Sequence, residues 1–267
     1  MTILLALLIL FVVSILLVKG RTGHKKLPAL GGWKYAHRGL HSAGVPENSL
    51  AAFSAAKAAG YGIELDIHLM KDGELAVIHD SSLKRVAGED VSIETLAVPQ
   101  LSDYYLEGTK ERIPLLSQVL KLLDGQVPVI VELKSTKSNY VQLCEKVCNL
   151  LDGYKGLYCI ESFDPRCIVW LRMHRPEIIR GQLSEDFFKT GGNLPWPVKL
   201  LMKYHLCNFL SQPDFIAYRF EDRNNFSNFV IRKFWGVQGI VWTIRNKEDF
   251  DTAMKEDWIP IFEGFLP

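Results

Sequence analysis

The chain has 267 residues, of which 48% are hydrophobic and 23% are charged. This composition excludes a disordered tail and a minimal binding module, and the length suits one large α/β domain of roughly 250 residues. The 31 basic and 30 acidic side chains give a formal net charge of +1. Because domains that bind nucleic acid usually carry a basic excess, we expect no nucleic acid partner.

Apolar residues are concentrated at the N-terminus. Between Ile3 and Val18 the only polar side chain is Ser14. As a helix, a run of this length spans roughly 24 Å, close to the ~30 Å hydrocarbon core of a bilayer. We therefore predict a transmembrane anchor over residues 1–20 and a basic linker over residues 21–32.

A cleaved signal peptide is the main alternative for this segment, and a buried first helix is a weaker one. A signal peptide requires positive charge before its apolar core and a small-x-small cleavage site after it, and the sequence has neither. The basic residues instead follow the apolar run, as Lys19, Arg21, Lys25 and Lys26. By the positive-inside rule they predict a single-pass protein of the cell membrane, with its folded domain on the cytoplasmic side.

Strand and helix patterns alternate along the rest of the chain. The strands are expected at residues 34–38, 62–69, 74–78, 127–134, 157–162, 178–183, 215–218, 239–243 and 258–262. The helices are expected at residues 48–59, 115–123, 140–151, 165–174, 226–235 and 247–256. With residues 74–78 set aside as a hairpin addition, eight βα units predict an α/β fold of the TIM (β/α)8 barrel type, and a doubly wound open sheet is the alternative.

The second of these strands carries three ionisable side chains on one face. They are Glu64, Asp66 and His68, because alternate residues of a strand point the same way. Burying such groups inside a barrel is costly unless they are paired. Two carboxylates at this spacing converge on a hard cation, which prefers oxygen ligands. A solvent-facing strand of alternating polarity is the alternative, and the βα series favours the metal site.

Further polar residues stand at the ends of other strands. Glu132 and Lys134 end a buried-type strand, and the carboxyl ends of barrel strands are where active sites lie. We interpret Glu132 as a third metal ligand rather than as half of a structural ion pair. His37 and His79 also follow strands, and two imidazoles there can serve as general acid and base. Arg38 suits bidentate contact with phosphate oxygens.

Eight short motifs follow one another in a fixed order on separate predicted elements. They are His37-Arg38-Gly39, Pro46-Glu47-Asn48-Ser49, Glu64-Leu65-Asp66, Lys71-Asp72-Gly73, His79-Asp80, Ile113-Pro114, Glu132-Leu133-Lys134 and Val241-Trp242-Thr243. In this arrangement the sequence resembles the glycerophosphodiester phosphodiesterase family of the PLC-like phosphodiesterases, over about residues 33–263. The resemblance implies a barrel domain over residues 33–267 with a small insertion after the second strand, at about residues 70–113.

The resemblance also implies an activity. Members of the family bind one divalent cation, Ca²⁺ or Mg²⁺, and hydrolyse glycerophosphodiesters to sn-glycerol 3-phosphate and an alcohol. The matching residues here would be Glu64, Asp66 and Glu132 as metal ligands, His37 and His79 as the catalytic acid–base pair, and Arg38, Glu47, Lys134 and Trp242 as substrate-binding residues.

Two segments stand apart from the family pattern. Family members often end the last strand with Thr-Asp, whereas this chain has Phe262-Glu263, and we assign no role to Glu263. Residues 194–213 are expected to contain a short amphipathic helix. This helix either packs on the barrel or contacts lipid or an acyl chain.

The preferred hypothesis is a metal-dependent glycerophosphodiester phosphodiesterase at the membrane surface. The alternative with the same chemistry is lysophospholipase-D-like hydrolysis of lysophospholipids or glycerol-phosphate polymers. A catalytically silent barrel that acts as a membrane-bound scaffold or sensor predicts loss of a histidine or ligand, and the sequence retains all of them. The released alcohol, the native cation and the oligomeric state are left open.

Overall fold

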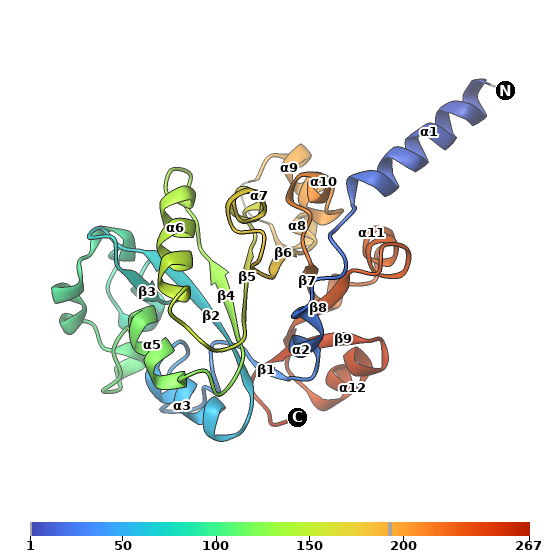
Figure 1. The fold of residues 1–267 in the computed structure, drawn as a ribbon. Helices are drawn as coiled ribbons and strands as arrows, with labels where there is room; N and C mark the ends of the chain where they lie inside the picture. The colour runs from blue at the N-terminus through green and yellow to red at the C-terminus, as the bar shows by residue number, and fades with distance from the viewer. Residues whose placement is uncertain (1, 192–193) are drawn as a thin grey trace.

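The computed structural model describes residues 2–191 and 194–267. Its strands are β1 (Tyr35–Ala36), β2 (Gly62–Leu69), β3 (Leu75–Val77), β4 (Val129–Leu133), β5 (Tyr158–Ser162), β6 (Arg180–Ser184), β7 (Phe215–Arg219), β8 (Gln238–Ile244) and β9 (Trp258–Phe262). All except β3 run parallel, and β1 pairs with both β2 and β9, so the sheet closes into a barrel (Figure 1). The short β3 adds to β2 in the antiparallel direction. The predicted barrel and hairpin addition are confirmed, and the open sheet is excluded.

The alternation along each strand divides the side chains between the barrel interior and the surrounding helices. On β4, Ile130 belongs to the interior cluster, together with Phe215 of β7. Val129 and Val131 belong to the cluster that packs between the strands and the helices. Glu132 lies two residues beyond Ile130 and is therefore on the interior side, at the carboxyl end of its strand.

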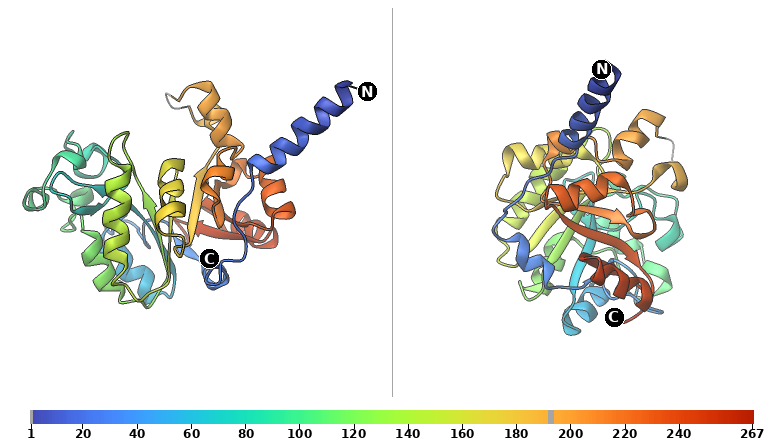
Figure 2. Two further views of the ribbon diagram at one scale, coloured as in Figure 1. Left: turned by 45° about the horizontal axis from the view of Figure 1, so that its top comes forward. Right: turned by 90° about the vertical axis from the view of Figure 1, so that its right-hand side faces the viewer.

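Helices surround the barrel, as the views in Figures 1 and 2 show. Those next to the strands are α2 (Leu27–Gly31), α3 (Leu50–Ala58), α5 (Leu116–Leu123), α6 (Tyr140–Leu151), α7 (Pro165–His174), α11 (Phe226–Phe229) and α12 (Lys247–Lys255). The predicted helix at residues 226–235 is α-helical only in its first turn and continues as the π-helix η5 (Val230–Phe234). α3 begins two residues later than predicted because the Ser49 side chain caps it, accepting a hydrogen bond from the Ala52 amide.

The first strand is shorter than the predicted residues 34–38. It ends at Ala36, and Arg38 and Gly39 have left-handed backbone conformations, with φ of 53° and 81°. A side chain on Gly39 would meet the Ala52 backbone at 2.9 Å, so the turn requires glycine there. The chain thus leaves the barrel directly after His37, and this turn brings His37 and Arg38 to the strand ends.

Residues 70–113 lie beside the barrel, outside its βα series. Besides β3 they contain α4 (Lys84–Ala87) and the 3₁₀ helices η1 (Ile93–Thr95), η2 (Val98–Asp103) and η3 (Leu106–Gly108). Their apolar side chains form a separate core that includes Ile78, Leu83 and Ile93. Residues 81–113, for which no helix or strand was predicted, are therefore ordered by the packing of their own apolar side chains.

The N-terminal helix α1 (Thr2–Leu17) projects away from the barrel (Figures 1 and 2). Near its end, the carbonyl oxygen of Ile15 accepts a hydrogen bond from Trp235 at 2.9 Å. Of its described side chains, Leu4 is 76% exposed and Ile9 is 54% exposed. No described helix is both long enough and apolar enough to cross a membrane. The structure therefore does not support the predicted transmembrane anchor.

Between β6 and β7 the chain forms α8 (Phe187–Thr190), α9 (Trp196–Lys203) and α10 (Asn208–Ser211). The amphipathic helix predicted within residues 194–213 corresponds to α9. A turn with His205 at φ 54° separates it from α10. Residues such as Leu201, 39% exposed, leave part of α9 open to solvent.

Candidate active site

The carboxyl ends of the barrel strands surround a hollow of about 360 Å³, which we call the central cleft. Seven of the nine residues predicted for the site line it: His37, Arg38, Glu64, His79, Glu132, Lys134 and Trp242. The other two, Asp66 and Glu47, lie outside this lining and each form an ion pair with Arg38. The fold thus assembles residues that are up to 205 positions apart in the sequence, from His37 to Trp242.

Three carboxylates lie close together at the central cleft, and two of them, Glu64 and Glu132, line it. Glu64 and Asp66 come from β2, and Glu132 of β4 is in register with Asp66. Their ligand oxygens lie within 4.8 Å of one another, and all three side chains are buried. Burial, together with the charges of Asp66 and Glu132, raises the pKa of Glu64 well above its usual value. Burial raises the pKa of Glu132 to about 7.

Two basic side chains lie against this carboxylate trio. Lys134 Nζ is 3.0 Å from Asp66 Oδ1 and 2.7 Å from Glu132 Oε1. The Arg38 backbone amide donates to Glu64 Oε2 at 3.0 Å, and its Nε is 3.4 Å from Asp66 Oδ2. Burial disfavours the Asp66 carboxylate, but Lys134 and Arg38 hold the pKa of Asp66 well below its usual value. The cleft therefore contains fixed negative and positive charge side by side.

Each predicted catalytic histidine is fixed at its Nδ1 atom by a carboxylate. His37 Nδ1 is 2.5 Å from Glu263 Oε2, and His79 Nδ1 is 2.6 Å from Asp80 Oδ1. His37 Nε2 is 3.9 Å from Glu64 Oε2, so this nitrogen faces the carboxylate trio. Burial lowers the pKa of His37, and it lowers the pKa of His79 to about 4. Both imidazoles are therefore neutral near pH 7 and able to accept a proton.

The two remaining substrate-binding predictions differ in their surroundings. Trp242 lines the cleft, and its ring stands perpendicular to that of Phe163 with 5.6 Å between the centroids. Glu47 instead accepts hydrogen bonds from Arg38 at 2.9 Å and from Arg85 at 2.6 Å. Its present contacts position Arg38, and direct contact of Glu47 with a substrate stays a prediction.

His68, which shares the face of Glu64 and Asp66, is occupied elsewhere. Its Nδ1 is 2.7 Å from Glu94 Oε1, and its Nε2 is 3.0 Å from the carbonyl oxygen of His79. These contacts connect β2 to the residues 70–113. His68 therefore holds the backbone of His79 in place and is not part of the carboxylate trio.

Sequence reasoning assigned no role to three residues that the structure brings into the site. Glu263 and Asp80 anchor the two histidines. Glu161 of β5 lines the cleft, is paired in register with Glu132, and is 1% exposed with no hydrogen-bond partner for Oε2 among the described residues. The alternation of side chains along β5 was the signal that could have identified Glu161 as a residue of the barrel interior. The contact of Glu263 with His37 depends on closure of the barrel, so no local pattern could have signalled it.

The carboxylate trio fits a divalent cation. Its donors are all oxygens, which Ca²⁺ and Mg²⁺ prefer over the nitrogen and sulfur ligands typical of zinc. Three carboxylates within 4.8 Å repel one another, and the raised pKa values of Glu64 and Glu132 reflect this repulsion together with their burial. A cation held between them would offset the negative charge that Lys134 and Arg38 only partly compensate.

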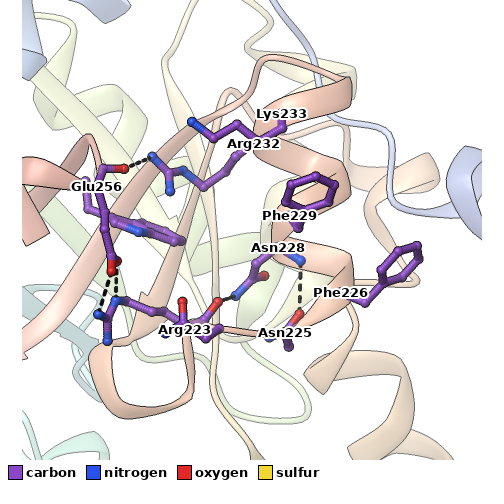
Figure 3. A pocket seen from close by; sticks show the side chains of 10 residues that line it. Arg223, Asn225, Phe226, Asn228, Phe229, Arg232, Lys233 and Glu256 are labelled. Carbon is purple, nitrogen blue, oxygen red and sulfur yellow. Dashed lines mark hydrogen bonds and ion pairs between the residues drawn. The ribbon is translucent and has the colours of Figure 1, made fainter.

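A second hollow, of about 480 Å³, lies beside α11 and the start of β9 (Figure 3). Two of its arginines bind Glu256: Arg223 Nε donates to Glu256 Oε2 at 2.7 Å, and Arg232 donates to the Glu256 carbonyl at 2.9 Å. None of the nine predicted site residues lines it. Its polar groups therefore hold the outer helices together rather than form a reaction centre.

The position of the central cleft, at the carboxyl ends of the barrel strands, indicates that the protein is an enzyme. Chemistry at the carboxyl ends of (β/α)8-barrel strands is typical of enzymes. Neutral histidines beside the two basic side chains, Arg38 and Lys134, suit proton transfer during the cleavage of phosphate esters.

Comparisons with known proteins agree with this class. Residues 37–262 match the model of the glycerophosphoryl diester phosphodiesterase family. The chain is 30% identical over 233 residues to a glycerophosphodiester phosphodiesterase from Caldanaerobacter subterraneus subsp. tengcongensis. This match covers 82% of this chain and 88% of that protein. Over 122 residues it is 34% identical to a lysophospholipase D from Rattus norvegicus, covering 41% of this chain and 38% of the rat protein.

A phosphodiesterase from Oleispira antarctica, solved in complex with the product sn-glycerol-3-phosphate, shares the fold. The TM-score is 0.71 at 21% identity, and the match covers 86% of this chain and 92% of the other. The chain therefore belongs to the glycerophosphoryl diester phosphodiesterase family. This result confirms the resemblance seen in the motifs and the prediction of an enzyme.

Proposed function

We propose that this protein is a metal-dependent enzyme that hydrolyses glycerophosphodiesters to sn-glycerol 3-phosphate and an alcohol. The observation that carries the proposal is the position of His37 and His79. Both are anchored by carboxylates, and both line one cleft together with Glu64, Glu132 and the basic side chains of Arg38 and Lys134. Membership of the phosphodiesterase family supports the same reaction.

Substrate binding follows from the charges of the cleft. Lys134 and Arg38 each lie within 3.4 Å of Asp66, so their positive charges converge on one region. A phosphodiester anion placed there receives hydrogen bonds from both side chains. The carboxylates of Glu64, Asp66 and Glu132 would hold a divalent cation, which would further neutralise the charge of the phosphoryl oxygens.

The histidines carry the proton transfers. One imidazole takes the proton of the attacking oxygen, which belongs to water or to the 2-hydroxyl of the glycerol. This oxygen forms a bond to phosphorus as the bond from phosphorus to the alcohol oxygen breaks. The other histidine, protonated once the anionic substrate is bound, gives its proton to the departing alcohol. If the 2-hydroxyl attacks, the product of this step is a cyclic glycerol phosphate. Water then bonds to its phosphorus as the bond to the 2-oxygen breaks, the histidines exchange roles, and sn-glycerol 3-phosphate is released. Glu263 and Asp80 occupy the Nδ1 atoms and leave Nε2 of each ring for these transfers.

The test uses the purified full chain with glycerophosphocholine and glycerophosphoethanolamine, first with EDTA and then with Ca²⁺ or Mg²⁺ added back. We expect release of sn-glycerol 3-phosphate that depends on the cation. His37→Ala and His79→Ala should each lower turnover by about 10² to 10⁴-fold, the usual contribution of a general acid or base. His174→Ala, which removes an exposed histidine at the end of α7, is the control. Near-normal activity of both cleft variants, or no hydrolysis with either cation, would contradict the proposal.

We also propose that α1 associates with the cytoplasmic surface of the cell membrane. The helix projects from the barrel with exposed apolar side chains such as Leu4 and Ile9, and the exposed basic residues Lys19, Lys25 and Lys26 follow it. Apolar and basic groups in this order suit an anionic lipid surface. Sedimentation with phosphatidylglycerol vesicles should therefore be lost in the double variant Leu4→Asp, Ile9→Asp, while hydrolysis of soluble glycerophosphocholine is unchanged. Equal sedimentation of both proteins would overturn this role of α1.

Lysophospholipids are a second candidate substrate class with the same chemistry. An apolar groove adjoins the central cleft, and the rat relative is named as a lysophospholipase D. The alternative of a catalytically silent scaffold is disfavoured, because the predicted histidines, basic side chains and carboxylates are present and lie together.

A further inference from the structure

Arg85 lies on α4, outside the lining of the central cleft, and binds two carboxylates. Its Nε donates to Asp80 Oδ2 at 2.6 Å, and its Nη2 donates to Glu47 Oε1 at 2.6 Å. Each carboxylate also holds a residue that lines the cleft. Asp80 is bonded to His79 Nδ1 at 2.6 Å, and Glu47 accepts a hydrogen bond from Arg38 at 2.9 Å. A continuous chain of five side chains, which we call the rim chain, therefore joins Arg38 to His79.

The packing of residues 70–113 fixes the backbone of Arg85. Its neighbours Leu83 and Val86 are buried in the separate core of this segment. The Ala87 amide donates to the Leu83 carbonyl at 2.7 Å, which closes the turn of α4 around Arg85. The guanidinium therefore reaches its two partners from an ordered base, although 47% of the side chain is exposed.

The two contacts of Arg85 use different nitrogens of one rigid plane. Because a guanidinium is planar and its donors are fixed, it sets Asp80 Oδ2 and Glu47 Oε1 in position relative to one another. Burial disfavours both carboxylates in their charged form, but hydrogen bonds from Arg85 and from their other partners hold the pKa of Glu47 and the pKa of Asp80 below their usual values. Both carboxylates therefore remain charged acceptors near pH 7.

A merely structural ion pair is the alternative, and Arg175 offers a comparison within the chain. Arg175 also bridges two carboxylates, those of Asp152 and Glu177. These partners are 55% and 60% exposed, and neither lines the central cleft. The partners of Arg85 are only 29% and 13% exposed, and each is bonded to a residue that lines the cleft. Arg85 is therefore connected to the reaction site in a way that an ordinary surface ion pair is not.

We propose that Arg85 is a positioning residue that fixes Arg38 and His79 relative to one another. It acts through the two carboxylates of the rim chain. This inference rests on the proposed phosphodiesterase activity and adds to it a residue that does not line the cleft. Without Arg85, the Asp80 carboxylate is free to turn, and the imidazole bonded to it turns as well. Glu47 likewise loses the contact that connects it to α4. Phosphate binding and proton transfer both lose alignment, and a displacement of about 1 Å can cost about 100-fold in rate.

The test measures kcat and KM separately on glycerophosphocholine, with the cation that supports the wild type. Arg85→Met removes both contacts, so it should lower kcat at least tenfold through His79 and raise KM at least threefold through Arg38. Arg85→Lys keeps the charge but lacks the fork of donors, so it should recover only part of the loss. Arg175→Met is the matched control, and it should leave both constants within twofold of the wild type.

Double variants assign each effect to its carboxylate. In the Asp80→Asn enzyme, Arg85→Met should lower kcat no further but should still raise KM. In the Glu47→Gln enzyme, it should raise KM no further but should still lower kcat. An ion pair with a purely structural role would instead lower the thermal midpoint and add the same loss in every background.

The outcomes separate this role from the proposed function. If the wild type hydrolyses glycerophosphocholine and Arg85→Met keeps both constants within twofold, the role of Arg85 is wrong and the proposed function stands. Equal losses in all backgrounds, or the same loss in Arg175→Met, also overturn it. If Arg85→Met does not fold, Arg85→Lys takes its place in each comparison, with at least a threefold loss of kcat expected. If the wild type hydrolyses neither glycerophosphocholine nor glycerophosphoethanolamine with either cation, the proposed function fails, and the role of Arg85 fails with it.

Discussion

Replacing Glu263 by glutamine tests whether the carboxylate at the end of β9 acts through His37. Glu263 Oε2 lies 2.5 Å from His37 Nδ1, and Glu263 is absent from the lining of the central cleft. The Gln side chain keeps the size and the hydrogen-bonding capacity but removes the negative charge. Any effect on the reaction should therefore pass through the imidazole or through Arg245, which lines the cleft and donates a hydrogen bond to Glu263 Oε1 at 2.8 Å. We class Glu263 as a positioning residue.

The expected magnitude follows from the contact between Glu263 and His37. A hydrogen bond to a charged partner contributes about 1.5–3 kcal/mol, and it is strongest when the imidazole is protonated during the reaction. Because 1.36 kcal/mol corresponds to a factor of ten in rate, kcat should fall by about 10- to 100-fold. KM should change little, since Glu263 does not contact the bound substrate. The contact with Glu263 raises the pKa of His37 against the effect of burial, so the pH limb that reports His37 should move to lower pH.

The assay is a full pH profile of kcat and KM on glycerophosphocholine, together with the thermal midpoint of each protein. Glu263→Asp keeps the charge and should recover part of kcat. Glu221→Gln is the matched control, because Glu221 is 51% exposed after β7 and pairs only with Arg219, at 3.0 Å, among the described residues. A Glu263→Gln enzyme with kcat within threefold of wild type and an unmoved pH profile would refute the reasoning.

Three further predictions concern charge and burial. Burial lowers the pKa of His205 to about 3, so between pH 6.5 and 3 the unfolded chain binds a proton there that the folded chain does not. Between pH 7.5 and 5.0 the wild type should therefore lose about 2 kcal/mol more stability in urea than His205→Asn, and equal losses would contradict this. Arg21→Met should lower stability by about 2 kcal/mol, because it leaves the Asp214 carboxylate buried without its ion pair, whereas Lys25→Met should not. Because the pKa values of Glu64 and Glu132 are raised, a bound cation has to displace protons at low pH. Calorimetry should find Ca²⁺ or Mg²⁺ binding at least tenfold weaker at pH 6 than at pH 8, and pH-independent affinity would argue against the carboxylate trio as the metal site.

The parts of the fold that the sequence predicted well are those with strong local patterns. β2, α6 and α7 have the predicted bounds, since alternation on the strand and 3.6-residue periodicity on the helices report directly which face is buried. No regular element was predicted for residues 81–113, because their short helices bury apolar side chains in a core of their own. These helices have three to six residues, which is too short for a hydrophobic periodicity to signal them.

The residues of the candidate site also divide into those that a local pattern predicts and those whose contacts depend on tertiary packing. Glu64, Asp66 and Glu132 could be predicted because each lies on a strand whose alternation assigns it to the barrel interior, and register then brings Asp66 and Glu132 together. Glu47 could be found as a motif residue, but its contacts with Arg38 and Arg85 depend on the packing of residues 70–113 against the first turn. A pattern along the chain carries no information about such a contact.

Glu263 shows most clearly why barrel closure determines the site. The His37 amide donates to the Phe262 carbonyl at 2.9 Å, a hydrogen bond between the first and last strands. The next side chain after Phe262 is Glu263, which this pairing brings to the His37 ring. The backbone contact that closes the barrel therefore also sets the orientation of His37, the proposed catalytic histidine. It follows that a change which loosens the pairing of β1 with β9 should reduce catalysis before it unfolds the domain.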